Sequence, residues 1–127
     1  MRFPAELKYT KDHEWAKAEG NSIVVGITDH AQSALGDIVY VDLPTAGRDL
    51  KPGETFGVVE SIKAVSDLYA PIAGKVVESN SPLKDDPSKI NQEPYTCWLI
   101  KVQPTDPNAL SQLMDAETYT KFVQNLK

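Results

Sequence analysis

The chain has 127 residues, the usual size of one domain, and we expect residues 1–127 to form a single domain around one core. Thirteen Lys and Arg against eighteen Asp and Glu give a net charge of −5, which argues against electrostatic binding to nucleic acid or to an anionic membrane. With one cysteine and two histidines, the chain can form neither an intrachain disulfide nor a zinc site of four Cys and His ligands, so we expect no bound metal.

The chain shows no segment that predicts a membrane or export signal. No apolar run reaches the ~20 residues of a transmembrane helix, and the opening Met-Arg-Phe-Pro lacks the apolar stretch of a signal peptide. The initial Met and the lack of a transit peptide favour a bacterial source. We therefore expect a protein of the bacterial cytoplasm.

The first part of the chain predicts a hairpin and a short helix. Turn residues at 19–21 separate residues 13–17 from the β-branched run 22–27. Thr28 is suited to cap a helix of under three turns, and Gly36 is suited to end it. Two further strands are expected at residues 37–43 and 55–61.

The next part predicts alternating turns and strands. We expect a turn from Ile62 to Asp67, a short extended piece that ends at Pro71, and a strand at residues 75–80. Residues 58–61 (Val-Val-Glu-Ser) reappear as residues 76–79, a faint repeat that would suit two strands paired about a rough two-fold axis. Residues 81–94 predict a surface loop because they contain three prolines and several charges, and residues 98–102 predict the last strand.

The C-terminal part predicts helices. Asp106 and Pro107 form a good helix start, and Asp115 offers a second cap. Tyr119, Phe122, Val123 and Leu126 follow helical spacing, so we expect an amphipathic helix packed on the sheets. Many short strands with Gly and Pro turns, flanked by short helices, predict a mainly β fold, either a sandwich or a flattened barrel.

The most informative segment runs from Gly57 to Pro71 and places one lysine, Lys63, at a hairpin tip. With the motifs below, this segment closely resembles the H proteins of the glycine cleavage system, over roughly residues 5–126 and in the same order. The other matching motifs are Lys8-Tyr9, His13-Glu14-Trp15, Gly26-Ile27-Thr28-Asp29-His30-Ala31-Gln32, Leu35-Gly36-Asp37, Asp42-Leu43-Pro44 and Asn91-Gln92-Glu93-Pro94-Tyr95.

The resemblance implies a barrel-sandwich hybrid of the lipoyl-domain type, with two antiparallel sheets, a short helix in the N-terminal half and C-terminal helices. It also implies that Lys63 is acylated by lipoic acid, which would make a flexible arm of roughly 12 to 15 Å. Glu60 and Ser61 would then be contacts for the lipoylating enzyme, although a solvated strand end explains them equally well.

Other interpretations of Lys63 are a lysine without a task in an exposed turn, or a biotin attachment site. Biotin carriers usually have Met on both sides of the lysine, whereas this chain has Ile62 and Ala64. We therefore favour lipoylation.

The resemblance further implies a cleft that shelters an aminomethyl group on the arm. By position, Glu14 and Asp67 would hold its cationic amine, with Asp12 and His13 on the same loop as Glu14. An apolar wall would come from three residues of or near the short helix, namely Ile27, Ala31 and Leu35. The alternative is that the carboxylates are ordinary surface charges and that the apolar side chains are core.

By this resemblance the chain is a non-enzymatic, monomeric carrier. Its partners would be the glycine decarboxylase, the tetrahydrofolate-dependent aminomethyltransferase and dihydrolipoyl dehydrogenase, besides a lipoate ligase or a lipoyl or octanoyl transferase. Pyridoxal phosphate, folate, FAD and NAD would belong to those partners.

One loop departs from the family pattern. Two residues and no glycine separate Tyr95 from Trp98, where the family has a glycine-containing triplet. This departure motivates a second hypothesis, an H-like relay that passes lipoyl groups to other complexes. A third hypothesis is an unmodified β domain used for protein interaction.

Overall fold

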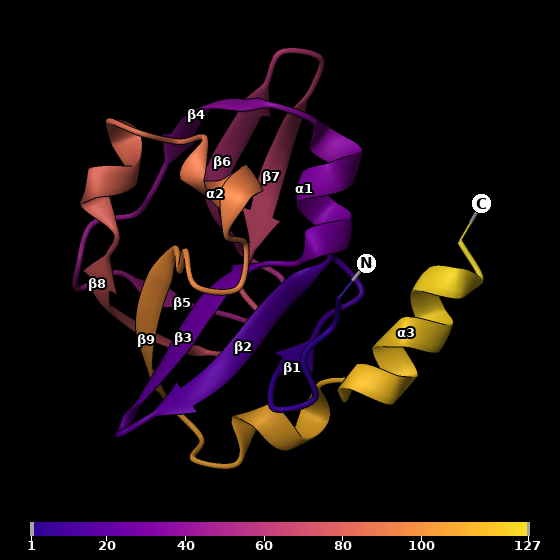
Figure 1. Ribbon diagram of the computed structural model, residues 1–127. Coiled ribbons are helices and arrows are strands. Elements are labelled where there is room, and N and C mark those ends of the chain that lie inside the picture. Colours follow the sequence, from indigo (N-terminus) through magenta and orange to yellow (C-terminus); the bar gives the residue numbers. More distant parts are fainter. Residues whose placement is uncertain (1, 127) are drawn as a thin grey trace.

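Two antiparallel sheets build the molecule (Figure 1). The structure, a computed structural model, describes residues 2–126. The larger sheet has the order β1-β2-β3-β9-β8-β5, and the smaller has the order β4-β6-β7. The strands are β1 (Lys8–Tyr9), β2 (Glu14–Glu19), β3 (Ser22–Ile27), β4 (Ile38–Asp42), β5 (Asp49–Leu50), β6 (Thr55–Ser61), β7 (Val65–Tyr69), β8 (Gly74–Ser79) and β9 (Ile100–Pro104).

The main core lies between the sheets and beneath the helices. Val25 of β3, Val59 of β6 and Ile100 of β9 are almost fully buried in it. The helices are α1 (Asp29–Leu35), the 3₁₀ helix η1 (Ser81–Lys84), α2 (Lys89–Gln92), the 3₁₀ helix η2 (Ala109–Gln112) and α3 (Ala116–Gln124). This arrangement confirms the expected mainly β fold of two antiparallel sheets with a few short helices. Among the described residues, none of the helices is long and apolar enough to cross a bilayer.

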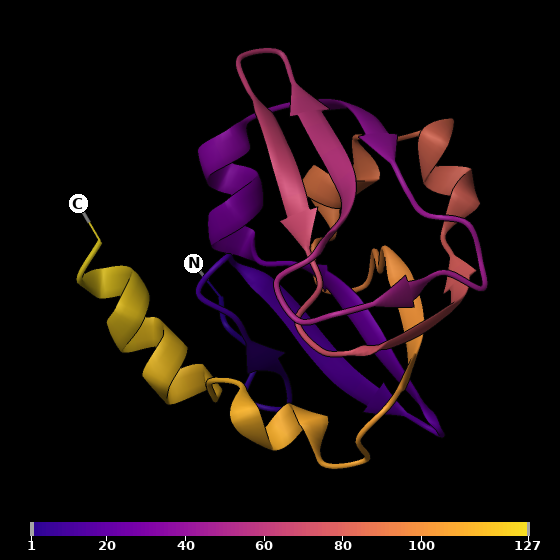
Figure 2. The same cartoon turned by 180° about the vertical axis from the view of Figure 1, so that it is seen from behind.

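The caps of α1 confirm the prediction for its ends. The Thr28 hydroxyl accepts a hydrogen bond from the Ala31 backbone N–H, as an N-cap should. Gly36 ends the helix with a φ of +81°, and its N–H donates to the Gln32 carbonyl. These caps fix the two ends of α1, and Figure 2 shows this helix beside β7, from the side on which β6 and β7 lie in front.

The expected turn from Ile62 to Asp67 is wrong, because β7 already begins at Val65. The Ser61 hydroxyl accepts hydrogen bonds from the backbone N–H groups of Lys63 (3.3 Å) and Ala64 (3.0 Å), and the Ser61 N–H donates to the Ala64 carbonyl. The serine thereby closes a tight turn, so the chain returns to the sheet three residues earlier than its turn composition suggests.

Residues 81–94 also differ from the expected surface loop. They contain η1 and α2, whose Leu83 and Ile90 are buried in the main core. The last strand begins at Ile100 rather than Trp98, and the short strands β1 and β5 were not predicted. Strands of two residues have too little periodicity to be seen in a sequence.

The faint repeat does not correspond to a strand pair. Residues 58–61 lie in β6 of the smaller sheet, and residues 76–79 lie in β8 of the larger sheet. The two copies therefore do not pair with each other.

The C-terminal helix α3 forms as predicted, with Asp115 as its N-cap. Its buried residue, Tyr119, stacks on Tyr9 of β1 with ring centroids 4.6 Å apart. The helix start expected at Asp106 and Pro107 is a single 3₁₀ turn, η2. Figure 1 shows that α3 lies at the side of the molecule next to β1.

Candidate functional site

Lys63 lies at the tip of the hairpin between β6 and β7, and its side chain is exposed. Its neighbours are exposed as well, Ile62 to 73% and Val65 to 68%. Because the turn is closed by Ser61, the amine is presented from a fixed support rather than from a loose loop. A lysine amine in this position is open to an acylating enzyme.

The stem of Lys63 lies against the end of α1. A β-carbon placed on Gly36 would come within 3.2 Å of the Lys63 Cε. Gly36 therefore serves twice, since it adopts the positive φ that ends the helix and leaves room for the lysine stem. The amine starts its path on the side of the hairpin that faces α1.

Glu14 is buried at the start of β2, with 2% of its surface exposed. One carboxyl oxygen accepts a hydrogen bond from the Thr10 hydroxyl (2.8 Å), and the other accepts one from the Tyr69 backbone N–H (3.3 Å). Burial raises the pKa of Glu14 to about 8, although these two hydrogen bonds act in the opposite direction. Glu14 is therefore a largely protonated, buried carboxyl group at neutral pH.

Glu14 and Asp12 line a pocket of about 430 Å³. Asp12 is exposed at its rim, and its backbone N–H donates to the Thr10 hydroxyl. The remaining wall is mostly apolar, with Lys11 and Gln112 among its polar members, and comes from β1, the segment after β7, the segment before α3 and α3 itself. It includes Tyr9, Ala70, Pro71, Leu113, Met114 and Phe122. A small group that enters here meets one buried carboxyl in apolar surroundings.

Asp67 does not line this pocket. It is exposed on β7, two residues before Tyr69, and pairs with Val58 of β6. The structure thus places Asp67 on the strand that runs from Lys63 toward Glu14, but outside the pocket that contains Glu14.

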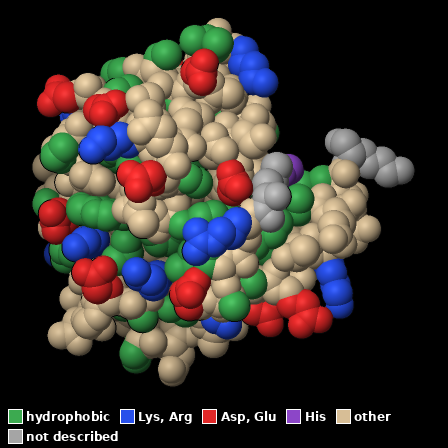
Figure 3. Space-filling model, in the orientation of Figure 1, with side chains coloured by type: hydrophobic (Ala, Val, Ile, Leu, Met, Phe, Trp, Pro, Cys, Tyr) green, Lys and Arg blue, Asp and Glu red, His purple; other side chains and the backbone are tan. Residues whose placement is uncertain are grey.

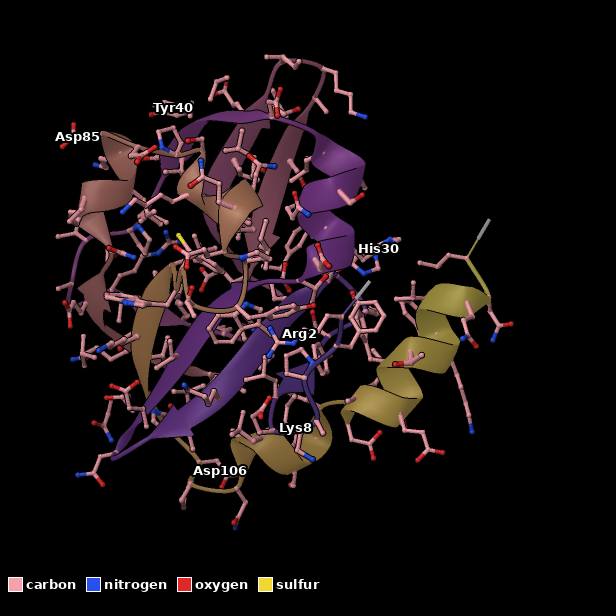
Figure 4. All side chains as sticks on the ribbon, viewed as in Figure 1. Arg2, Lys8, His30, Tyr40, Asp85 and Asp106 are labelled. Carbon is pink, nitrogen blue, oxygen red and sulfur yellow. The ribbon has the colours of Figure 1, made fainter. Side chains whose placement is uncertain are left out.

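His13 is half-buried and has a φ of +69°. Its Nδ1 lies 2.8 Å from the Tyr119 hydroxyl, which is also 2.8 Å from the Thr28 hydroxyl. Its ring centroid is 4.5 Å from that of His30 on α1, which Figure 4 shows on the side of that helix toward α3. Burial and the neighbouring His30 lower the pKa of His13, so it is neutral at pH 7. His13 therefore contacts α1 and α3, and it does not line the pocket that contains Glu14.

The three residues expected to form an apolar wall are placed differently from one another. Ile27 is buried inside the main core, whereas Ala31 and Leu35 are partly buried and pack against the core from α1. Ala31 and Leu35 thus have side-chain surface that remains accessible on the helix.

Cys97 is buried, as expected for a small apolar residue. Burial raises the pKa of its thiol to about 11, so it is not a nucleophile at neutral pH. The neighbouring short loop is well tied, because the Trp15 indole donates to the Pro94 carbonyl (2.8 Å) and the Asp29 N–H donates to the Tyr95 hydroxyl (3.0 Å).

Sequence reasoning missed several residues of the site. Thr10, Met114 and Phe122 line the pocket with Glu14, and Tyr69 contributes only a backbone N–H. The helical spacing around Phe122 revealed an apolar face, but no signal in the sequence shows that this face meets Glu14. On the face shown in Figure 3, acidic and basic side chains are interspersed without a continuous basic area.

Residues 7–126 match the sequence model of the glycine cleavage H-protein family. The chain is 57% identical to a glycine cleavage system H protein of Anaeromyxobacter sp. (strain K), with 98% of both chains covered. It is 52% identical to one of Myxococcus xanthus (strain DK1622), over 96% of this chain and 95% of that one. The crystal structure of a glycine cleavage system H protein from Mycobacterium marinum superposes with a TM-score of 0.87 at 44% identity, over 95% of this chain and 98% of that one.

Proposed function

The chain belongs to the glycine cleavage H-protein family, and from this we propose that it is the carrier protein of a glycine cleavage system, with lipoic acid attached to Lys63. As in that family, the chain is a carrier component and not itself an enzyme. The single observation that supports the attachment site is the exposed Lys63 on a turn closed by Ser61. Bound as an amide, lipoic acid supplies a disulfide that accepts electrons and a sulfur that accepts the aminomethyl group of glycine.

The residues around Lys63 fit this group. The amine is exposed, and Ala64 beside it is small and exposed, so an enzyme can reach the nitrogen. The partners of the carrier are then the glycine decarboxylase, the tetrahydrofolate-dependent aminomethyltransferase and dihydrolipoyl dehydrogenase, with a lipoate ligase or a lipoyl or octanoyl transferase for attachment. We place it, as a monomer, in the bacterial cytoplasm.

We further propose that Glu14 receives the cationic amine of the aminomethyl group. Tyr69, whose N–H donates to Glu14, lies six residues after Lys63, or at most about 20 Å of extended chain. A lipoylated lysine has a reach of roughly 12 to 15 Å and therefore covers most of this span when the arm follows β7. A cation in the pocket favours the ionised carboxylate, so Glu14 would release its proton to solvent and form a buried ion pair.

Asp12 and Asp67 are the second carboxylates of this proposal. Asp12 at the rim attracts a cation to the pocket, and Asp67 does so along β7. Ala31 and Leu35 offer the apolar surface of α1, and His13 fixes the loop before Glu14 by its hydrogen bond to Tyr119.

The attachment site is tested by incubating the chain with lipoate ligase, ATP and lipoic acid. We expect the intact mass to rise by one lipoyl group. Lys63→Arg should abolish the increase, whereas Lys75→Arg, at an exposed lysine on β8, should leave it unchanged. Acylation that persists in Lys63→Arg would disprove the site.

The role of Glu14 is tested on the loaded protein. Glu14→Gln should leave lipoylation intact but shorten the lifetime of the aminomethyl group in solution, on the order of tenfold, because the neutral amide forms no ion pair. Asp67→Asn should have a smaller effect, and Asp85→Asn, at an exposed site in the loop after η1, should have none. Equal lifetimes for Glu14→Gln and the parent would rule out the role.

Carboxyl exchange distinguishes the carrier from a lipoyl relay. When the lipoylated chain is incubated with glycine decarboxylase, glycine and labelled bicarbonate, we expect label to pass from bicarbonate into glycine. A lipoylated chain that supports no exchange would instead favour the relay.

A further inference from the structure

The outer face of the smaller sheet has an unusual composition close to Lys63. The strand pairing puts Tyr40, Glu60 and Val65 in one row across β4, β6 and β7, and puts Asp42, Val58 and Asp67 in a second row. Paired residues of antiparallel strands point to the same face, and the row between them, with Val41 and Val59, is buried. We call these six residues the outer face. Three of them are carboxylates, and three are apolar or aromatic.

A β-bulge in β4 exposes the aromatic residue of this face. The register shifts between Ile38 and Tyr40, so both Ile38 and Val41 are buried, while Val39 (54%) and Tyr40 (50%) between them are exposed. In a regular strand one of the two middle residues would point inward. Figure 4 shows Tyr40 on the outside of β4. Tyr40 and Val65 thus lie exposed on either side of Glu60, and Val65 and the exposed tip residue Ile62 flank Lys63 in the hairpin.

An enzyme that acylates this chain has to select one lysine by the protein surface alone, because no prosthetic group is present before the reaction. Other lysines are also accessible, and some form ion pairs, such as Lys101 with Glu19 and Lys121 with Glu117. Lys63 differs from these in having the outer face beside it.

The charge of the outer face also suits such an enzyme. A lipoate ligase holds an acyl-adenylate, whose phosphate is anionic and needs cationic side chains around it. In the reaction the deprotonated Lys63 Nζ attacks the acyl carbonyl carbon, a C–N bond forms, and the bond from the acyl carbon to the phosphate oxygen breaks. AMP leaves with that electron pair, and the nitrogen gives up a proton to solvent. A basic ligase mouth is complementary to Asp42, Glu60 and Asp67.

We infer that the outer face is the surface on which the acyl-adenylate-using enzyme docks, with Tyr40 and Val65 as apolar anchors, Glu60 between them, and Asp42 and Asp67 at the two edges. This inference rests on the proposed attachment of lipoic acid to Lys63. By this inference the acylating enzyme recognises not only the hairpin but also β4, a strand that is distant from Lys63 in the sequence.

The test measures acylation of the unmodified full chain by lipoate ligase with ATP and lipoic acid, read by intact mass. Tyr40→Ser and Val65→Thr should each lower kcat/KM about tenfold, mainly through KM, while Tyr40→Phe should stay near the parent. Val77→Ser, at a residue exposed to 44% on β8 of the other sheet, is the matched control and should be unchanged. Val65→Thr keeps a β-branched residue at an exposed position, so it remains informative if Tyr40→Ser unfolds.

The double variant Asp42→Asn with Glu60→Gln tests the charge. Its acylation should depend less steeply on salt than that of the parent. Parent-like kinetics for both Tyr40→Ser and Val65→Thr would overturn the inference and leave the attachment site standing. So would a loss of glycine-dependent exchange with normal acylation, since the face would then serve another partner. No acylation of the parent would overturn the proposed function itself.

Discussion

At the scale of single residues, Glu14 is the most unusual group of the chain. It is buried beside Thr10 and Tyr69, and no cationic side chain of residues 2–126 lies within ion-pair distance of it. A buried carboxyl without a cation is costly in its charged form, which is why its pKa rises. A cationic guest removes this cost, so the same burial that destabilises the empty carboxylate favours binding of an amine.

The raised pKa of Glu14 predicts how the stability of the folded chain changes with pH. Between the ordinary value of 4.5 and about 8, the folded state holds a proton on Glu14 that the unfolded state releases. The contribution of Glu14 to stability is therefore full below pH 4.5 and is lost as the pH rises to about 8. We expect Glu14→Gln to be similar in stability to the parent at pH 5 and more stable at pH 8.5, by on the order of 3 kcal/mol.

Urea unfolding of the parent and Glu14→Gln at both pH values measures this difference. Comparing the two chains cancels other titrating groups, such as His13, whose lowered pKa acts with the opposite sign. An unchanged stability difference between pH 5 and pH 8.5 would contradict the assigned protonation of Glu14.

The sequence predicted the position of some site residues but not the burial of others. The position of Lys63 at a hairpin tip followed from local turn and strand patterns, and the hairpin is present. The burial of Glu14 could not be predicted, because it depends on Tyr69 and Phe122, which are distant in the sequence. The family resemblance implied Glu14 and Asp67 together as holders of the amine, whereas in the structure Glu14 is buried and Asp67 is exposed.

At the scale of elements, Tyr119 is the buried residue of α3 and connects this helix with β1 and with the α1 cap. Its ring stacks on Tyr9, and its hydroxyl joins the Thr28 hydroxyl of the α1 cap to His13 Nδ1. Phe122 of the same helix lines the pocket with Glu14. The attachment of α3 therefore also sets one wall of the pocket.

We expect Tyr119→Phe to loosen α3 before the sheets. The change removes one hydroxyl and leaves Thr28 and His13 without this partner, at a cost of about 1 to 2 kcal/mol. Hydrogen exchange should become faster in α3 than in β3 or β9. Tyr40→Phe, which removes a half-exposed hydroxyl, is the control, and equal exchange in the two variants would show that the Tyr119 hydroxyl does not hold the helix.

Elements with a local signal were predicted, and those made by packing were not. Thr28 and Gly36 delimit α1 by their own caps, so its ends were clear in the sequence. In contrast, η1 and α2 lie in a stretch rich in proline and charge, and they form because Leu83 and Ile90 are buried in the core. The pairing of β5 with β8 also depends on tertiary contacts.

At the scale of the whole molecule, both sheets enclose the main core, and the smaller sheet also carries the hairpin with Lys63 (Figures 1 and 2). The pattern of strands and turns indicated only a mainly β domain, and the ordered series of motifs was needed to indicate the family. The match over residues 7–126 and the TM-score of 0.87 agree with that expectation.

The most direct measurement is the mass of the protein purified from the cells that produce it, followed by peptide mapping. We predict one lipoyl group for each chain, located on the peptide that contains Lys63. A native protein without this group, in cells whose other lipoyl proteins are modified, or with the group on another lysine, would contradict the proposed carrier role of Lys63.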